Sequence, residues 1–139
     1  MCIRDRDGSE EMIRKATERG DGEFHHARLP GWSPPRRFDL LHSMEFLYYL
    51  EDPLAMLAEF QENWMEAGGV LVAGVDHYLE NEDSLDWPVG LGVHMTTLGQ
   101  EEWRQGMIEA GFLDVEIRRV GVKEGFVGTL AMFGRKPDD

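Results

Sequence analysis

The sequence contains only one cysteine, Cys2, in 139 residues. A single cysteine excludes an intrachain disulfide and any metal site built from several cysteines. No apolar run approaches the roughly 20 residues that span a bilayer, and the N-terminus has no apolar signal region. We therefore expect a soluble, cytoplasmic protein with no membrane partner.

Concentrated positive charge is also missing from the sequence. The 14 Lys and Arg residues stand against 27 Asp and Glu residues, and the formal net charge is −13 at pH 7. Nucleic-acid binding needs a basic stripe, whereas the short pairs Arg36-Arg37 and Arg118-Arg119 lie among acidic residues. The sequence also lacks the spaced clusters of three or four ligands that bind metals. We expect a small-molecule partner, no nucleic acid and no metal.

The central part of the sequence has the pattern of a strand, a helix and a second strand. Phe38–Ser43 and Val70–Val75 are apolar on both alternations, which is typical of buried strands in a parallel sheet. Between them, Asp52 is the expected N-cap of a helix, Pro53 its first residue and Gly68 its left-handed stop. This order predicts a crossover unit, with ligands binding beyond the carboxyl ends of the two strands.

The rest of the chain extends this α/β pattern. We expect one helix that begins at Ser9 and ends before Gly20, and a second over about Gln100–Ala110. A short strand is expected at Phe24–Ala27, and a final antiparallel pair at Val115–Val120 and Gly128–Phe133. A long irregular segment over 76–97 contains many apolar residues, so we expect it to pack rather than to be disordered.

Four segments together resemble class I S-adenosylmethionine-dependent methyltransferases, in particular the small-molecule methyltransferases. These are Asp7-x-Ser9-x-x-Met12, Phe38–Ser43, the helix followed by Gly68-Gly69-Val70-Leu71-Val72, and Glu102-Trp103 through Ala110-Gly111-Phe112-x-Asp114-Val115. The resemblance implies a Rossmann-like sheet, mostly parallel, with an antiparallel C-terminal strand and helices on both faces. The first strand and its Gly-rich loop are lacking before Asp7, so the resemblance is to an N-terminally truncated domain.

The N-terminal hexapeptide Met1-Cys2-Ile3-Arg4-Asp5-Arg6 resembles translated sequencing adapter. We expect residues 1–6 to be a non-native leader and residues 7–139 to be a partial methyltransferase domain. The only Gly-x-Gly motifs, Gly20-Asp21-Gly22 and Gly90-Leu91-Gly92, follow no buried strand. We therefore expect the full-length parent to transfer the methyl group and this chain alone to bind the cofactor poorly.

The resemblance also implies which residues contact S-adenosylmethionine. Asp7 stands where the family has a carboxylate that accepts hydrogen bonds from both ribose hydroxyls. Ala27 and Leu29 lie in the segment next to the adenine, to which they would offer apolar or backbone contacts. His42 and Ser43 end the strand that the family places against the methionine part.

Methyl transfer is an in-line displacement, so the protein aligns the donor with the acceptor and removes a proton where needed. Asp76 and His77 directly follow a predicted strand, and an imidazole has the more suitable ordinary pKa for a general base. The alternative is that His77 is an ordinary polar loop residue.

Candidates for the acceptor pocket follow both strands. Glu45 and Tyr48 come after the first strand of the crossover unit, and Tyr78 and Trp87 lie in the long irregular segment. For Tyr48, the alternative is a structural role beneath the helix.

Two other functions remain open from the sequence. The first is a fragment of an NAD(P)-dependent oxidoreductase, because an acidic residue after the second strand binds ribose in that class too. No Tyr-x-x-x-Lys proton relay is present, and the antiparallel last strand favours a methyltransferase. The second is a non-catalytic interaction module on the same fold.

Overall fold

The computed structural model describes residues 4–7, 11, 14–15, 23–26, 29 and 31–138, which fall into two compact units, Met1–Ser33 and Pro34–Asp139. In the first unit, strands β1 (Arg4–Asp7) and β2 (Glu23–His26) pair in parallel, with Asp7 opposite His26. The short strand predicted at Phe24–Ala27 is therefore confirmed as β2. Arg4–Arg6 lie in β1, and the origin of residues 1–6 stays a prediction. Most of the helix predicted after Ser9, and Ala27 itself, lie outside the described residues.

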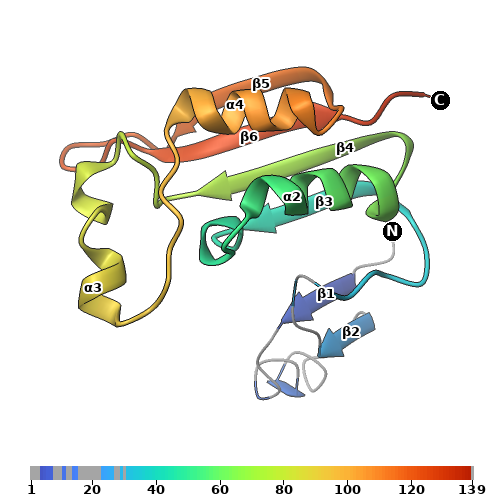
Figure 1. Ribbon diagram of the computed structural model, residues 1–139, viewed down its shortest axis with the longest axis horizontal. Helices are drawn as coiled ribbons and strands as arrows, with labels where there is room; N and C mark the ends of the chain where they lie inside the picture. The colour runs from blue at the N-terminus through green and yellow to red at the C-terminus, as the bar shows by residue number, and fades with distance from the viewer. Residues whose placement is uncertain are drawn as a thin grey trace. The chain divides into compact units, whose positions relative to one another are not determined.

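The second unit is built on a four-stranded sheet with the order β3-β4-β6-β5 (Figure 1). Its strands are β3 (Phe38–Met44), β4 (Met65–Val75), β5 (Leu113–Val120) and β6 (Thr129–Arg135). Strands β3 and β4 are parallel, whereas β6 is antiparallel to both of its neighbours, β4 and β5. The predicted Rossmann-like sheet, mostly parallel with an antiparallel C-terminal strand, is confirmed.

The sheet of the second unit has one well-covered face. Leu71, Ala73 and Val75 of β4 point to this face and are fully buried. On β3, however, Leu40 is 48% exposed and Met44 is 43% exposed, so the prediction that this strand is buried on both faces is wrong. The reason is that the helices described by the structure pack on the other face of the sheet, where Leu71, Ala73 and Val75 lie.

Two helices cover that face. Helix α2 (Pro53–Glu59) continues into a π-helical turn, η2 (Phe60–Trp64), and packs against α4 (Gln100–Glu109) (Figure 1). The carboxylate of Asp52 accepts a hydrogen bond from the Ala55 N–H at 3.1 Å, which confirms the predicted N-cap.

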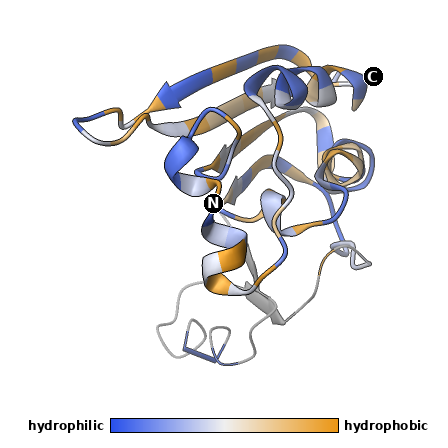
Figure 2. Cartoon of the chain, turned by 60° about the vertical axis from the view of Figure 1, so that its left-hand side comes forward, coloured by the Kyte–Doolittle hydropathy of each residue, from blue (hydrophilic) through white to orange (hydrophobic). Residues whose placement is uncertain are grey.

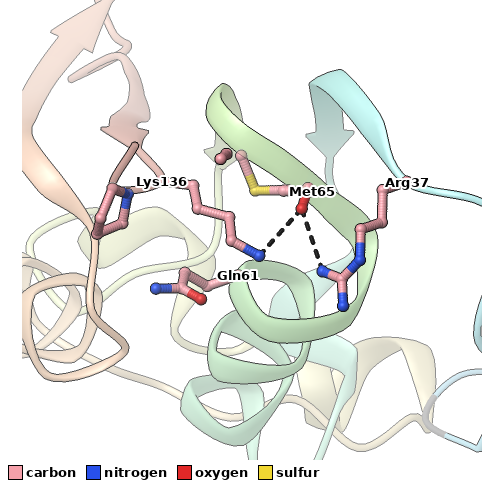
Figure 3. Close-up of a pocket in the computed structure, with 6 residues that line it drawn as sticks. Arg37, Gln61, Met65 and Lys136 are labelled. Carbon is pink, nitrogen blue, oxygen red and sulfur yellow. Dashed lines mark hydrogen bonds between the residues drawn. The ribbon is translucent and has the colours of Figure 1, made fainter. Parts of the chain in front are cut away.

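The helix that begins at Pro53 ends at Trp64, so the prediction that Gly68 stops it is wrong. Met65 already has an extended backbone, with φ −116° and ψ 141°. Figure 3 shows the Lys136 ammonium and the Arg37 guanidinium donating to the Met65 carbonyl, at 3.0 and 3.2 Å. Cations from distant segments thus satisfy the terminal carbonyls, a role that a glycine C-cap would otherwise fill.

The segment predicted as irregular, 76–97, contains two short helices, η3 (Glu82–Ser84) and α3 (Trp87–Leu91). Tyr78 and Met95 are buried, as expected for a packed segment, but Leu85 and Leu91 are exposed. Helix α3 includes hydrophobic residues (Figure 2), and its Val89 and Leu91 are 88% and 65% exposed. No helix among the described residues is long and apolar enough to cross a membrane.

Candidate functional site

Four of the predicted site residues lie together at the carboxyl ends of two adjacent parallel strands. Glu45 and Tyr48 follow β3, and Asp76 and His77 follow β4. The Glu45 N–H donates to the Gly74 carbonyl at 2.9 Å, so the chain leaves β3 still paired with β4. Because the carboxyl ends of parallel strands open to one edge of the sheet, this edge is the expected ligand site.

Glu45 has an unusual backbone conformation, and only one of its two carboxylate oxygens accepts a regular hydrogen bond among the described residues. Its φ of 53° places a non-glycine residue in the left-handed region. The Tyr48 hydroxyl donates to Glu45 Oε2 at 2.6 Å, whereas Oε1 is buried and has no hydrogen-bond partner among the described residues. Burial raises the pKa of Glu45, the Tyr48 hydroxyl opposes this, the charge of Asp76 adds to it, and the backbone N–H of Asp76 opposes it. The carboxylate is a proton acceptor.

Tyr48 itself lies in the core beneath this edge, with 3% of its surface exposed. Burial, followed by the hydrogen bond to Glu45, raises the pKa of its phenol, so Tyr48 is a hydrogen-bond donor and not a base. Tyr48 therefore packs in the core and also contacts a predicted pocket residue, Glu45.

Asp76 is fixed by neighbours from two other segments. Its Oδ1 accepts a hydrogen bond from the Thr129 hydroxyl of β6 at 2.6 Å, and its carbonyl accepts one from Asn81 Nδ2 at 2.8 Å. Thr129 is not predicted from the sequence, because its contact with Asp76 arises only when β6 pairs with β4.

His77 is completely buried and makes a hydrogen bond with each ring nitrogen. Its Nδ1 lies 3.0 Å from the Ser84 carbonyl, and its Nε2 lies 2.7 Å from the Thr97 hydroxyl. The imidazole ring is 5.5 Å from the Tyr48 ring and 6.2 Å from the Trp87 ring, measured between centroids. Burial lowers the pKa of His77, so the neutral form dominates at neutral pH.

The remaining pocket candidates differ in their placement. Trp87, at the start of α3, is partly exposed and stacks near His77, which puts it beside the cluster. Tyr78 is buried, and its hydroxyl donates to the Gly128 carbonyl at 2.7 Å, in the turn that precedes β6. The Tyr78 hydroxyl is therefore engaged by the backbone, whereas Trp87 lies beside the His77 ring.

The predicted cofactor residues are distributed over both units. Ser43, the next-to-last residue of β3, has a buried hydroxyl without a hydrogen-bond partner among the described residues, while His42 is exposed on the opposite face of the strand. Asp7 is the last residue of β1, at the carboxyl end of a strand, and Leu29 is half-buried. The contacts of these residues with the cofactor stay predictions.

A separate pocket of about 440 Å³ lies at the other edge of the sheet, where β4 begins and β6 has ended. It is lined by Arg37, Gln61, Met65, Ala67, Lys136 and Pro137. Two of these residues are the cations that bind the end of the helix before β4 (Figure 3). Burial, and then the charge of Arg37, lowers the pKa of Lys136. The cations that line this pocket stabilise the end of the helix. The pocket does not lie at the carboxyl ends of the parallel strands, where ligands are expected to bind.

The fold of the chain is similar to solved structures of S-adenosylmethionine-dependent methyltransferases. A Haloferax volcanii protein solved in complex with the Trm112 methyltransferase activator is 26% identical, with a TM-score of 0.77 over 96% of this chain and 71% of the other. A methyltransferase from Mesorhizobium loti is 17% identical, with a TM-score of 0.79 over 97% of this chain and 80% of the other. The N-methyltransferase NodS from Bradyrhizobium japonicum, solved with S-adenosyl-L-homocysteine, is 20% identical, with a TM-score of 0.75 over 98% and 67%.

These similarities define a class I methyltransferase-like fold. Several other matched structures are longer, and the chain spans only 41% to 53% of their length. No protein-family model matches the sequence, and no curated protein matches it.

Proposed function

We propose that the full-length protein containing this chain transfers the methyl group of S-adenosylmethionine to a small-molecule acceptor. The observation that carries the proposal is the group of proton acceptors at the carboxyl ends of β3 and β4. In a fold of this kind, that edge is where ligands bind. The Glu45 carboxylate has a buried oxygen there that makes no regular hydrogen bond among the described residues. The neutral imidazole of His77 lies beside the Tyr48 ring.

The cofactor contacts would be those that the resemblance implies for each residue. Asp7 would accept hydrogen bonds from the ribose hydroxyls, because an ionised carboxylate takes two donors at once. Ala27 and Leu29 would contact the adenine. His42 and Ser43 would lie beside the methionine part, and the buried Ser43 hydroxyl has no other partner among the described residues.

The acceptor would bind between Glu45, Tyr48 and Trp87, with Asp76 and His77 supplying proton-accepting groups. When bound, S-adenosylmethionine would supply the methyl group for in-line displacement by the acceptor atom, with the electron pair of the broken bond staying on sulfur. The proton lost by the acceptor passes to a base of this cluster. Tyr78 would support the pocket from below through its bond to Gly128.

Binding of S-adenosylmethionine, measured by titration calorimetry, tests the cofactor part. We expect weak binding by the 139-residue chain and micromolar binding by a longer chain that includes the Gly-rich strand implied by the resemblance. Asp7→Asn in that longer chain should weaken binding about tenfold or more, because hydrogen bonds to a charged acceptor are lost. Glu124→Gln, an exposed acid in the turn after β5, is the matched control and should leave binding unchanged.

Transfer of a labelled methyl group by the longer chain tests the activity. Binding without transfer to any acceptor would instead favour a non-catalytic interaction module. Enhanced fluorescence of reduced nicotinamide on mixing, with no binding of S-adenosylmethionine, would replace the proposal by an NAD(P)-dependent oxidoreductase.

A further inference from the structure

The hydrogen bonds of His77 determine which of its nitrogens is basic. A carbonyl oxygen only accepts hydrogen bonds, so the Nδ1 that lies 3.0 Å from the Ser84 carbonyl must carry the ring proton. In the neutral ring, Nε2 is then the sole proton acceptor. It lies 2.7 Å from the Thr97 hydroxyl, which donates to it. The basic nitrogen of His77 therefore faces Thr97.

Thr97 links this buried base to the surface. His77 is fully buried, whereas Thr97 is an exposed residue. An acceptor could touch Nε2 directly only after displacing the Thr97 hydroxyl. A hydroxyl both accepts and donates hydrogen bonds, so Thr97 can take one proton while it passes on another.

The segment that contains Thr97 is hydrogen-bonded to the loop that follows β3. The Thr96 N–H donates to the Tyr48 carbonyl at 2.7 Å, and the Thr96 hydroxyl donates to the Leu50 carbonyl at 2.5 Å. Tyr48 in turn donates to Glu45. Thr97 is thus held beside the same loop that supplies the proposed acceptor pocket.

We propose that Thr97 relays the proton between the methyl acceptor and His77, an inference that rests on the proposed function. As the acceptor atom bonds to the methyl carbon, its proton moves to Thr97 Oγ1. The original hydroxyl proton of Thr97 moves to His77 Nε2, and the ring becomes an imidazolium that still donates from Nδ1 to the Ser84 carbonyl. Reversal through Thr97 returns the proton to water. Thr97 is the group that touches the acceptor, and Ser84 positions the imidazole.

Titration of the His77 imidazole by nuclear magnetic resonance tests the proton path in the 139-residue chain without any acceptor. In the wild type, we expect the neutral ring to carry its proton on Nδ1. Thr97→Val should lower the pKa of His77 by about half to one pH unit, because the imidazolium loses the oxygen that accepts from Nε2. Thr97→Ser keeps the hydroxyl and should titrate like the wild type. The ionisable side chain beside the ring, Tyr48, is the same in all three proteins.

A proton on Nε2 in the neutral wild type, or the same pKa in Thr97→Val and Thr97→Ser, would overturn the proton path. The catalytic role is tested in the longer chain with tritium-labelled S-adenosylmethionine and a protein-free metabolite extract as the source of acceptor. Thr97→Val should slow methyl transfer about tenfold or more, and Thr97→Ser should stay within about threefold of the wild type.

Calorimetry with S-adenosylmethionine should give the same affinity for both variants. Equal rates for Thr97→Val and the wild type would refute the relay and leave the proposed function standing. An inactive wild type would refute the proposed function and the catalytic role of Thr97, while the imidazole titration still decides the proton path.

Discussion

The hydrogen bond between Tyr48 and Glu45 should stabilise the fold by an amount that depends on pH. Tyr48→Phe removes a buried donor whose oxygen lies 2.6 Å from Glu45 Oε2. A hydrogen bond to an ionised acceptor contributes about 1.5–3 kcal/mol, and one to a neutral acceptor about 0.5–1.5 kcal/mol. Because Glu45 is only partly buried, we expect values at the lower end of both ranges.

The sign of the pH dependence follows from the pKa of Glu45. Burial raises this pKa, and the Tyr48 hydroxyl partly opposes the shift. Tyr48→Phe therefore raises the pKa further, so that its cost in unfolding free energy grows as the pH rises through the pKa of Glu45. We expect a cost of about 1.5 kcal/mol near pH 8 and about 0.5 kcal/mol near pH 4.

Urea denaturation of the 139-residue chain at the two pH values measures this difference. Tyr78→Phe is the matched control, because its buried hydroxyl donates to a neutral carbonyl, that of Gly128, at 2.7 Å. Its cost of about 1 kcal/mol should be the same at both pH values. The double variant Tyr48→Phe with Glu45→Gln gives the coupling energy of the pair. A cost for Tyr48→Phe that does not change with pH would refute the reasoning.

Three further changes probe the packing and the buried ionisable group of the second unit. Asp52→Ala should lower the unfolding free energy by about 1 kcal/mol through loss of the N-cap, as read from urea midpoints. Gly134→Ala should lower the unfolding free energy by about 1–3 kcal/mol, because a Cβ there would lie 2.9 Å from the Cβ of Phe112. Gly90→Ala is the control and should not lower the unfolding free energy, because a Cβ there would meet nothing within 4 Å. Since burial lowers the pKa of His77 below 6.5, the unfolded state binds more protons as the pH falls through this value, and stability should decline there. His77→Gln should remove that part of the decline in a pH series of melting curves.

Much of the local structure is predictable because its causes are local. Asp52 and Pro53 start a helix through their own side chains, and the spacing of Trp103 and Met107 in α4 predicts the face that is buried. The ends of buried strands identify Glu45, Tyr48, Asp76 and His77 as candidates for the site, and the structure places them together.

The parts of the site that the sequence does not reveal depend on contacts between distant segments. The partners of His77 are Ser84 and Thr97, which come from different parts of an irregular segment and follow no periodic pattern. Thr129 reaches Asp76 only because β6 lies next to β4. Hydroxyl residues in loops are too common for their side-chain partners to be inferred from spacing alone.

The sequence by itself determined the α/β order of elements, the parallel crossover unit and the candidates at its strand ends, because side-chain periodicity and capping act over a few residues. Only the tertiary structure decided that β6 lies between β4 and β5, that Arg37 and Lys136 end a helix where a glycine was expected, and that the basic nitrogen of His77 faces Thr97. Each of these joins groups far apart in the chain, and such contacts are fixed by the packing of the whole sheet and not by any local preference.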